Sequence, residues 1–114
     1  MLSRSQSFGV LRNAMSAYAL RLKVLANNIA NVDTPGFLRS SVSFEDRLAK
    51  AQSKGGTEQA LDSIRPEVQG DNVAPSVEEE LLLLTETQMK NHVATRAMHE
   101  HFATARMAIT GRTA

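Results

Sequence analysis

The sequence contains no cysteine and no tryptophan, and only one tyrosine and four phenylalanines among its 114 residues. The lack of cysteine excludes a disulfide scaffold, a thiolate zinc site and a cysteine nucleophile. The shortage of rings argues against a core filled by aromatic side chains. Six glycines and three prolines are too few for a collagen-like or proline-rich fibre.

Neither sign of charge dominates the chain. Thirteen Lys and Arg stand against twelve Asp and Glu, a net charge of +1, which does not indicate nucleic acid or an acidic membrane as a partner. No apolar run approaches the roughly 20 residues of a transmembrane helix. Arg12, Asn13 and Ser16 interrupt the apolar pattern near the N-terminus, so we expect no secretory signal peptide.

An apolar seam runs through the first part of the chain and predicts a helix over residues 5–31. Its members alternate in steps of three and four, which places them on one side of a helix: Phe8, Leu11, Met15, Tyr18, Leu22, Leu25 and Ile29. The helix should end before Thr34, because Pro35 disfavours a helical conformation at the preceding residue. Pro35-Gly36 is typical of a type II turn.

A second long helix is predicted from residue 77 to about residue 109. Ser76 and Glu79 have the spacing of a capping box, and acidic residues 78–80 suit the positive end of the helix dipole. Heptad spacing selects Val77, Leu81, Leu84, Gln88, Asn91, Thr95, Met98, Phe102, Ala105 and Ile109 as its seam. A seam on the adjacent face, through Met89, Val93 and Ala97, fits equally well, and both alternatives stay open.

Residues 38–75 show little periodicity. A short helix is predicted over residues 44–49, after Ser43. From Ser53 to Pro75 the chain is polar and rich in turn residues, which predicts a flexible or irregular linker. The predicted fold is therefore all-α: two long terminal helices, residues 1–37 and 76–114, form an elongated coiled-coil-like hairpin and one core domain, with residues 38–75 between them.

Two helices with one narrow seam each bury little apolar surface when they fold on each other. Ordering each residue costs roughly 1–2 kcal/mol of backbone entropy, so we expect a weakly folded monomer. Such seams are satisfied by further helices from neighbouring chains. The pattern is typical of an assembly component.

No constellation indicates catalysis, a metal or a cofactor. His92, His99 and His101 lack the i,i+4 spacing that suits a metal on a helix. The glutamates at 78–80 point to different faces, and dipole compensation accounts for them. We predict a non-enzymatic protein without a cofactor or a small-molecule substrate.

Asparagines are concentrated at the end of the first helix, at Asn27, Asn28 and Asn31. Asparagine is a mediocre helix former, so the presence of three asparagines within five residues calls for an explanation. One alternative is capping of a fraying helix end. The other is hydrogen bonding between subunits of a packed polymer.

Residues 26–37, Ala-Asn-Asn-Ile-Ala-Asn-Val-Asp-Thr-Pro-Gly-Phe, closely resemble the N-terminal signature of bacterial flagellar axial proteins, which include rod, hook and hook-associated subunits. The resemblance implies that N- and C-terminal helices pair into a coiled coil within a tubular axle. It assigns the signature and inter-subunit contacts to Asn27, Asn28, Asn31, Thr34, Pro35, Gly36 and Phe37.

The short chain resembles the proximal rod subunits within that family. Residues 72–98 look like the FlgB family of rod subunits, although Ala74-Pro75-Ser76 and His92 depart from its usual pattern. The resemblance implies a structural rod subunit that transmits torque from motor to hook. Its implied partners are copies of itself, other rod proteins, basal-body ring and rod-adaptor proteins, and the type III export apparatus.

The resemblance also implies a place in the basal-body rod, across the periplasm, and export through the flagellar apparatus without a cleaved signal. Phe44 and Leu48 resemble the Phe-x-x-x-hydrophobic motif of early export substrates. An amphipathic helical turn would produce the same spacing. The alternatives to a FlgB-type subunit are another proximal rod subunit, or a small coiled-coil adaptor or export chaperone.

Overall fold

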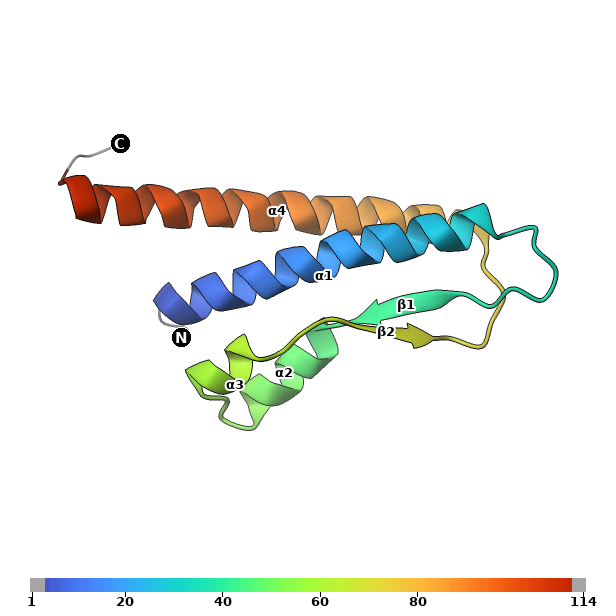
Figure 1. Ribbon diagram of the computed structural model, residues 1–114, viewed down its shortest axis with the longest axis horizontal. Coiled ribbons are helices and arrows are strands. Elements are labelled where there is room, and N and C mark those ends of the chain that lie inside the picture. Colours follow the sequence, from blue (N-terminus) through green and yellow to red (C-terminus); the bar gives the residue numbers. More distant parts are fainter. Residues whose placement is uncertain (1–3, 112–114) are drawn as a thin grey trace.

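The computed structural model describes residues 4–111 and shows an elongated, mostly helical body that measures 59 × 33 × 15 Å. Two long helices, α1 (Arg4–Ala30) and α4 (Val77–Thr110), lie antiparallel along its length (Figure 1). Between them the chain forms β1 (Ser40–Ser43), α2 (Glu45–Ser53), α3 (Glu58–Asp62) and β2 (Glu67–Gly70). The predicted long helical hairpin is confirmed. None of the described helices is long and apolar enough to span a bilayer.

The ends of α4 are formed differently. At its C-terminal end, Gly111 adopts a left-handed φ of 68° and donates its N–H to the Met107 carbonyl at 2.8 Å, a glycine C-cap. At its N-terminal end the predicted capping box is wrong. The Ser76 hydroxyl makes no cap bond and instead pairs with the Glu78 carboxylate at 3.1 Å.

The middle segment has more regular structure than the sequence pattern indicated. The predicted short helix is present as α2, but the stretch expected to be an irregular linker contains α3 and β2. Strands β1 and β2 pair antiparallel, with Val42 opposite Val68. In the sequence, α2 and α3 separate β1 from β2. The pairing of the two strands therefore produces no periodic pattern in any one stretch of sequence. An isolated two-stranded sheet is marginal, so packing on α1 must support it.

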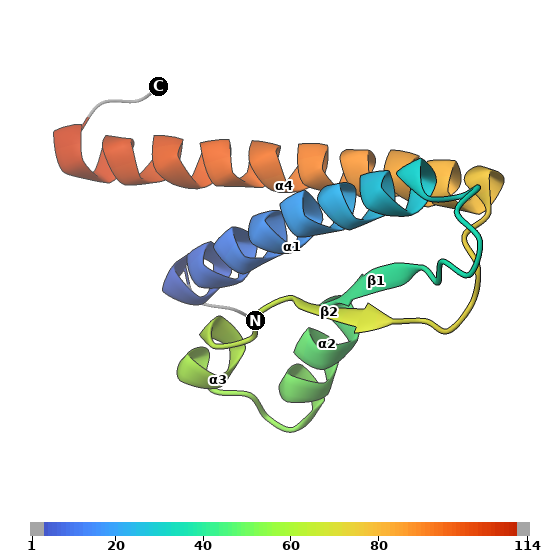
Figure 2. The ribbon, with the colours of Figure 1, turned by 45° about the vertical axis from the view of Figure 1, so that its right-hand side comes forward.

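A small apolar core joins the middle segment to α1. Ala14 and Ala17 on α1 contact the buried ring of Phe44, and Tyr18, Leu48 and Ile64 pack around it. The small alanines let α2 and α3 lie close below α1 (Figure 2). The middle segment is therefore a folded layer against one side of α1, while α4 covers another.

Helix α4 packs on α1 through a face that the sequence pattern did not select. Its buried residues are Glu80, Thr87 and Ala94, which repeat every seven residues. This face is rotated by about one residue from the predicted heptad seam. Leu81, Phe102 and Ile109, expected in that seam, are instead 47%, 49% and 84% exposed.

Candidate functional site

The signature segment ends α1 and turns the chain toward β1. Phe37 donates its backbone N–H to the Thr34 carbonyl at 3.1 Å, and Gly36 has a φ of 76°. This left-handed conformation at the third position, after Pro35, is that of the predicted type II turn. The turn places β1 directly beneath the last turns of α1.

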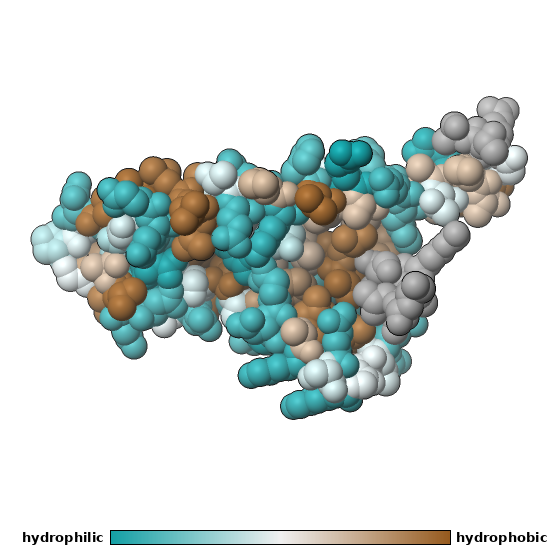
Figure 3. All heavy atoms as spheres, turned by 180° about the vertical axis from the view of Figure 1, so that it is seen from behind, coloured by the Kyte–Doolittle hydropathy of each residue, from teal (hydrophilic) through white to brown (hydrophobic). Residues whose placement is uncertain are grey.

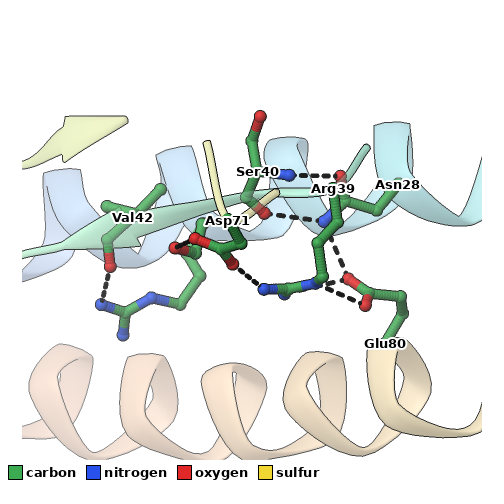
Figure 4. A network of polar contacts seen from close by, with 8 residues as sticks. Asn28, Arg39, Ser40, Val42, Asp71 and Glu80 are labelled. Carbon is green, nitrogen blue, oxygen red and sulfur yellow. Dashed lines mark hydrogen bonds and ion pairs between the residues drawn. The ribbon is translucent and has the colours of Figure 1, made fainter. Parts of the chain in front are cut away.

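Asn28 fastens that turn to both neighbouring elements. Its side chain is fully buried. Its amide nitrogen donates to the Ser40 carbonyl and to Glu80 Oε1, each at 2.8 Å, and its amide oxygen accepts the Ser40 N–H at 3.1 Å (Figure 4). The amide of Asn28 is thus occupied within the chain, and the predicted inter-subunit contact at Asn28 stays a prediction.

The other two asparagines of the signature differ from Asn28. Asn31 donates its amide to the Asn27 carbonyl at 2.9 Å and accepts the Thr34 hydroxyl at 3.2 Å, which closes the helix end locally. Asn27 is exposed. A contact from Asn27 to another subunit stays a prediction.

Arg39 and Glu80 form the centre of a buried ion cluster. Arg39 donates from Nε to Glu80 Oε2 at 2.9 Å and from Nη2 to Glu80 Oε1 at 3.2 Å. It also pairs with Asp71, which accepts the Ser41 hydroxyl at 2.8 Å. The hydrogen bond to Glu80 raises the pKa of Arg39 above its ordinary value. Glu80 is fully buried, so it depends on Arg39 and Asn28 for compensation.

A second ion cluster lies at the other end of β1. Arg21 donates to both Glu45 oxygens, at 2.8 and 2.6 Å, and to the Val42 carbonyl at 2.8 Å. Lys90 on α4 reaches the same carboxylate at 3.2 Å. The hydrogen bond from Arg21 lowers the pKa of Glu45 to about 2. The two clusters thus tie the middle segment to both long helices.

Sequence reasoning missed these clusters. It assigned Glu80 to dipole compensation along with Glu78 and Glu79, and it gave Arg39 and Asp71 no role. The partners come from distant parts of the chain, and no spacing rule connects them.

The outer side of α4 is apolar and open. Leu82, Met89 and Val93 are 69%, 67% and 67% exposed. With Leu11 and Tyr18 of α1 they line a groove of about 680 Å³. Seen from behind, hydrophobic side chains gather in a hollow beside α4 (Figure 3). Leu82, Met89 and Val93 are therefore mostly exposed to solvent, on the wall of a groove that α4 shares with α1.

The remaining predicted seam residues fall into two groups. Leu25 is buried between α1 and its neighbours. The half-buried ones, which touch both the fold and the solvent, are Phe8, Leu11, Met15, Tyr18, Leu22, Ile29, Leu84 and Met98. The Phe8 ring lies 4.9 Å from His101 and 5.8 Å from Phe102, measured between ring centroids. Packing of these residues against other subunits stays a prediction.

The predicted export motif lies inside the fold. Phe44 is buried and Leu48 is half-buried, and both face the α1 alanines. This is the amphipathic arrangement that their spacing also predicted. A role in export stays a prediction, and it requires that α2 leave this position.

Within residues 4–111, no three His, Cys, Asp or Glu side chains are placed to hold a metal ion. The polar residues that come together, Arg39, Glu80, Asn28, Arg21 and Glu45, satisfy one another. These contacts hold β1, α2 and the two long helices together.

Comparison with known proteins identifies the signature region. Residues 8–37 match the family model of the flagella basal body rod protein. The chain is 40% identical over 55 residues to the flagellar basal body rod protein FlgB of Aeromonas hydrophila, covering 48% of this chain and 42% of the relative. It is 51% identical over 37 residues to FlgB of Borreliella burgdorferi, covering 32% and 27%.

A flagellar basal-body rod protein FlgG, from Buchnera aphidicola subsp. Schizaphis graminum, is 33% identical over 60 residues, covering 53% of this chain and 23% of the relative. The chain spans less than half the length of these curated relatives. No solved structure matches it. The signature that forms the turn, the helix that precedes it and these likenesses agree: residues 8–37 carry the flagella basal body rod protein pattern, and the chain is similar to flagellar basal-body rod proteins.

Proposed function

We propose that this chain is a FlgB-like subunit of the proximal rod, and that it polymerises through its terminal helices into the axle that transmits torque from motor to hook. The observation that carries the proposal is the orientation of α4. This helix buries Glu80 and Thr87 and exposes Leu82, Met89 and Val93. Exposed apolar surface of this kind marks a site of protein–protein contact.

The choice of FlgB among rod proteins rests on identity. The aligned segments are 40% and 51% identical to two FlgB proteins and 33% identical to a FlgG protein. The FlgB alignments also cover a larger share of the relatives, 42% and 27% against 23%. Another proximal rod subunit is the second candidate, and no structural feature favours it.

The proposed mechanism is mechanical. One end of α4 projects past the start of α1 (Figure 1), and its last turn carries Ile109, which is 84% exposed. Contacts between such an end and a different surface of the next subunit do not close on themselves, and they generate a helical tube. The two ion clusters keep β1 fixed to both helices, so that load on one helix is passed to the rest of the subunit.

The proposed partners are copies of this chain, other rod proteins, and the ring and rod-adaptor proteins of the basal body. Export through the type III apparatus as an unfolded chain completes the proposal. Phe44 and Leu48 lie in the core cluster. They become available to an export gate only in an unfolded chain, which supports recognition before folding.

The proposal is tested by replacing the gene in its own bacterium with an Ile109→Asp variant. We expect the variant to be secreted but swimming to be lost, because a charge on the projecting end prevents packing against the next subunit. His99→Asp, an exposed position on the same helix, is the matched control and should swim normally. Normal swimming of a strain that lacks the gene would overturn the proposal.

A further inference from the structure

The exposed apolar stripe of α4 is short and lies in the first half of the helix. Leu82, Met89 and Val93 follow one another at i, i+7 and i+11, which places them on one face. Figures 1 and 2 show no other element on the side of α4 that faces away from α1 and the middle segment. The stripe is open to a partner helix because its three side chains are 67–69% exposed, and the groove that they line with Leu11 and Tyr18 of α1 lies beside it.

Charge along α4 changes sign at the stripe. The first half of the helix carries Glu78, Glu79 and Glu86, besides the buried Glu80, and no basic residue before Lys90. The second half carries Lys90, Arg96 and Arg106 against Glu100. Among the described residues neither Glu78 nor Arg96 belongs to a salt bridge. On the face of the stripe itself, Glu78 lies at one end and Arg96 at the other, and Glu100 follows Arg96 in line with Leu82, five turns after it.

We propose that this face binds the same face of a second copy of the chain, with the two α4 helices antiparallel about a two-fold axis. A parallel pair would place Glu78 beside Glu78 and Arg96 beside Arg96, and like charges side by side are destabilising. An antiparallel pair places Glu78 of each copy beside Arg96 of the other. A two-fold interface needs a surface that is complementary to itself. The stripe meets this requirement, because Glu78 at one end can pair with Arg96 at the other end of a second copy.

The spacing sets the register of the pair. Glu78 and Arg96 lie at equal distances along the helix on either side of Thr87, and the segment from one to the other makes about five full turns, so both lie on the same side of the stripe. With the axis at the level of Thr87, Glu78 of one copy meets Arg96 of the other. Leu82 then lies beside Val93 of the second copy, and the two Met89 side chains meet near the axis.

The absence of cysteine from the chain gives a direct test by cross-linking. Met89→Cys should form a disulfide-linked dimer rapidly under mild oxidation. Gln88→Cys is the matched control: it is also exposed and lies one residue away on a different face, so it should cross-link at least tenfold more slowly. Equal rates for the two variants would overturn the proposal.

Charge exchange tests the antiparallel register. Glu78→Arg and Arg96→Glu should each raise the dimer dissociation constant by about three- to tenfold, as expected for solvent-exposed ion pairs present twice. The double variant should restore it, measured by sedimentation equilibrium in low salt. Failure of the double variant to recover affinity would overturn the register.

Two further results would overturn the whole inference. One is a wild-type chain that remains monomeric at about 1 mM, which would require a dissociation constant weaker than about 1 mM. The other is a Glu78→Cys variant that cross-links to its own copy as fast as Met89→Cys, which indicates a parallel pair. The inference concerns the free protein and does not rest on the proposed rod function, because swimming is not among its readouts.

Discussion

The two faces of α4 reverse the usual distribution of polar and apolar residues. The inner face, against α1, buries Glu80, Thr87 and Ala94, and the outer face exposes Leu82 and Met89. Burial of a charged residue costs several kcal/mol unless it is paired, and Arg39 and Asn28 provide that pairing. The contrast indicates that the polar face specifies the position of α4, whereas the apolar face is available to other chains.

The strongest test of this contrast is removal of the buried charge. Glu80→Ala should lower the free energy of unfolding by about 3–5 kcal/mol, because Arg39 is left with a buried and only partly compensated charge. Urea unfolding followed by circular dichroism measures the change. Glu79→Ala, an exposed neighbour, should change stability by less than about 0.5 kcal/mol. If Glu80→Ala and Glu79→Ala lowered the free energy of unfolding equally, the pairing of Glu80 with Arg39 and Asn28 would not hold α4 in place.

The next largest effect is expected at Asn28. Asn28→Ala leaves the Ser40 N–H without its partner and removes one of the donors to Glu80. Loss of buried hydrogen-bond partners costs about 1–3 kcal/mol. The same urea titration measures it, with the exposed Asn27→Ala as control. If both variants were as stable as the wild type, the hydrogen bonds of Asn28 to Ser40 and Glu80 would not stabilise the chain.

The signature turn gives a smaller and purely conformational effect. Gly36→Ala should destabilise the fold by about 1–2 kcal/mol, because a residue with Cβ is strained at a φ of 76°. Gly70→Ala is the matched control, since an added Cβ there meets nothing within 4 Å and the backbone is not left-handed. Thermal unfolding of both variants measures the difference. A stabilised Gly36→Ala variant would exclude the type II turn.

The second ion cluster predicts a pH dependence. The pKa of Glu45 is lowered from 4.5 to about 2 in the folded chain, so its contribution is present above about pH 4.5 and is lost as the pH falls toward 2. The Glu45 side chain is 39% exposed, so solvent screening limits the effect to about 1 kcal/mol or less. Urea unfolding gives the free energy of unfolding at pH 7 and at pH 3. The decrease between the two pH values should be smaller for Glu45→Gln than for the wild type. Asp46→Asn, exposed in the same turn, should keep the wild-type difference.

The smallest effect is predicted on the outer face. Met89→Ala and Val93→Ala should each change the unfolding free energy of the dilute protein by less than about 0.5 kcal/mol, because both side chains are 67% exposed. The comparison with Glu80→Ala is decisive, because removal of the polar residue should then cost more unfolding free energy than removal of either apolar residue. A loss of about 2 kcal/mol or more at Met89, the size expected for truncation of a core side chain, would mean that this face supports the monomer's own fold.

Local signals in the sequence predicted the elements that depend on local physics. The predicted bounds of α1 and α4 agree with the observed Arg4–Ala30 and Val77–Thr110 within one residue. Pro35 and Gly36 correctly indicated the turn. These features follow from backbone preferences and hydrophobic period, which neighbouring residues determine.

Features that depend on distant partners were not predictable in this way. The packed face of α4 is set by Glu80, whose partners Arg39 and Asn28 come from other parts of the chain. A pattern search that counts only apolar residues selects Leu81 in its place and rotates the helix by one position. The pairing of β1 with β2 was missed for the same reason, since such short strands carry too little alternation to be recognised.

The most direct test of the account is the chemical accessibility of the outer face of α4 before and after assembly. A Met89→Cys variant can be treated with a maleimide as dilute free protein and, separately, within purified basal bodies. We predict rapid modification of the free protein and strong protection in the basal body, with an exposed Ser53→Cys variant modified in both. Equal modification of Met89→Cys in the two states would contradict the claim that neighbouring chains cover this face.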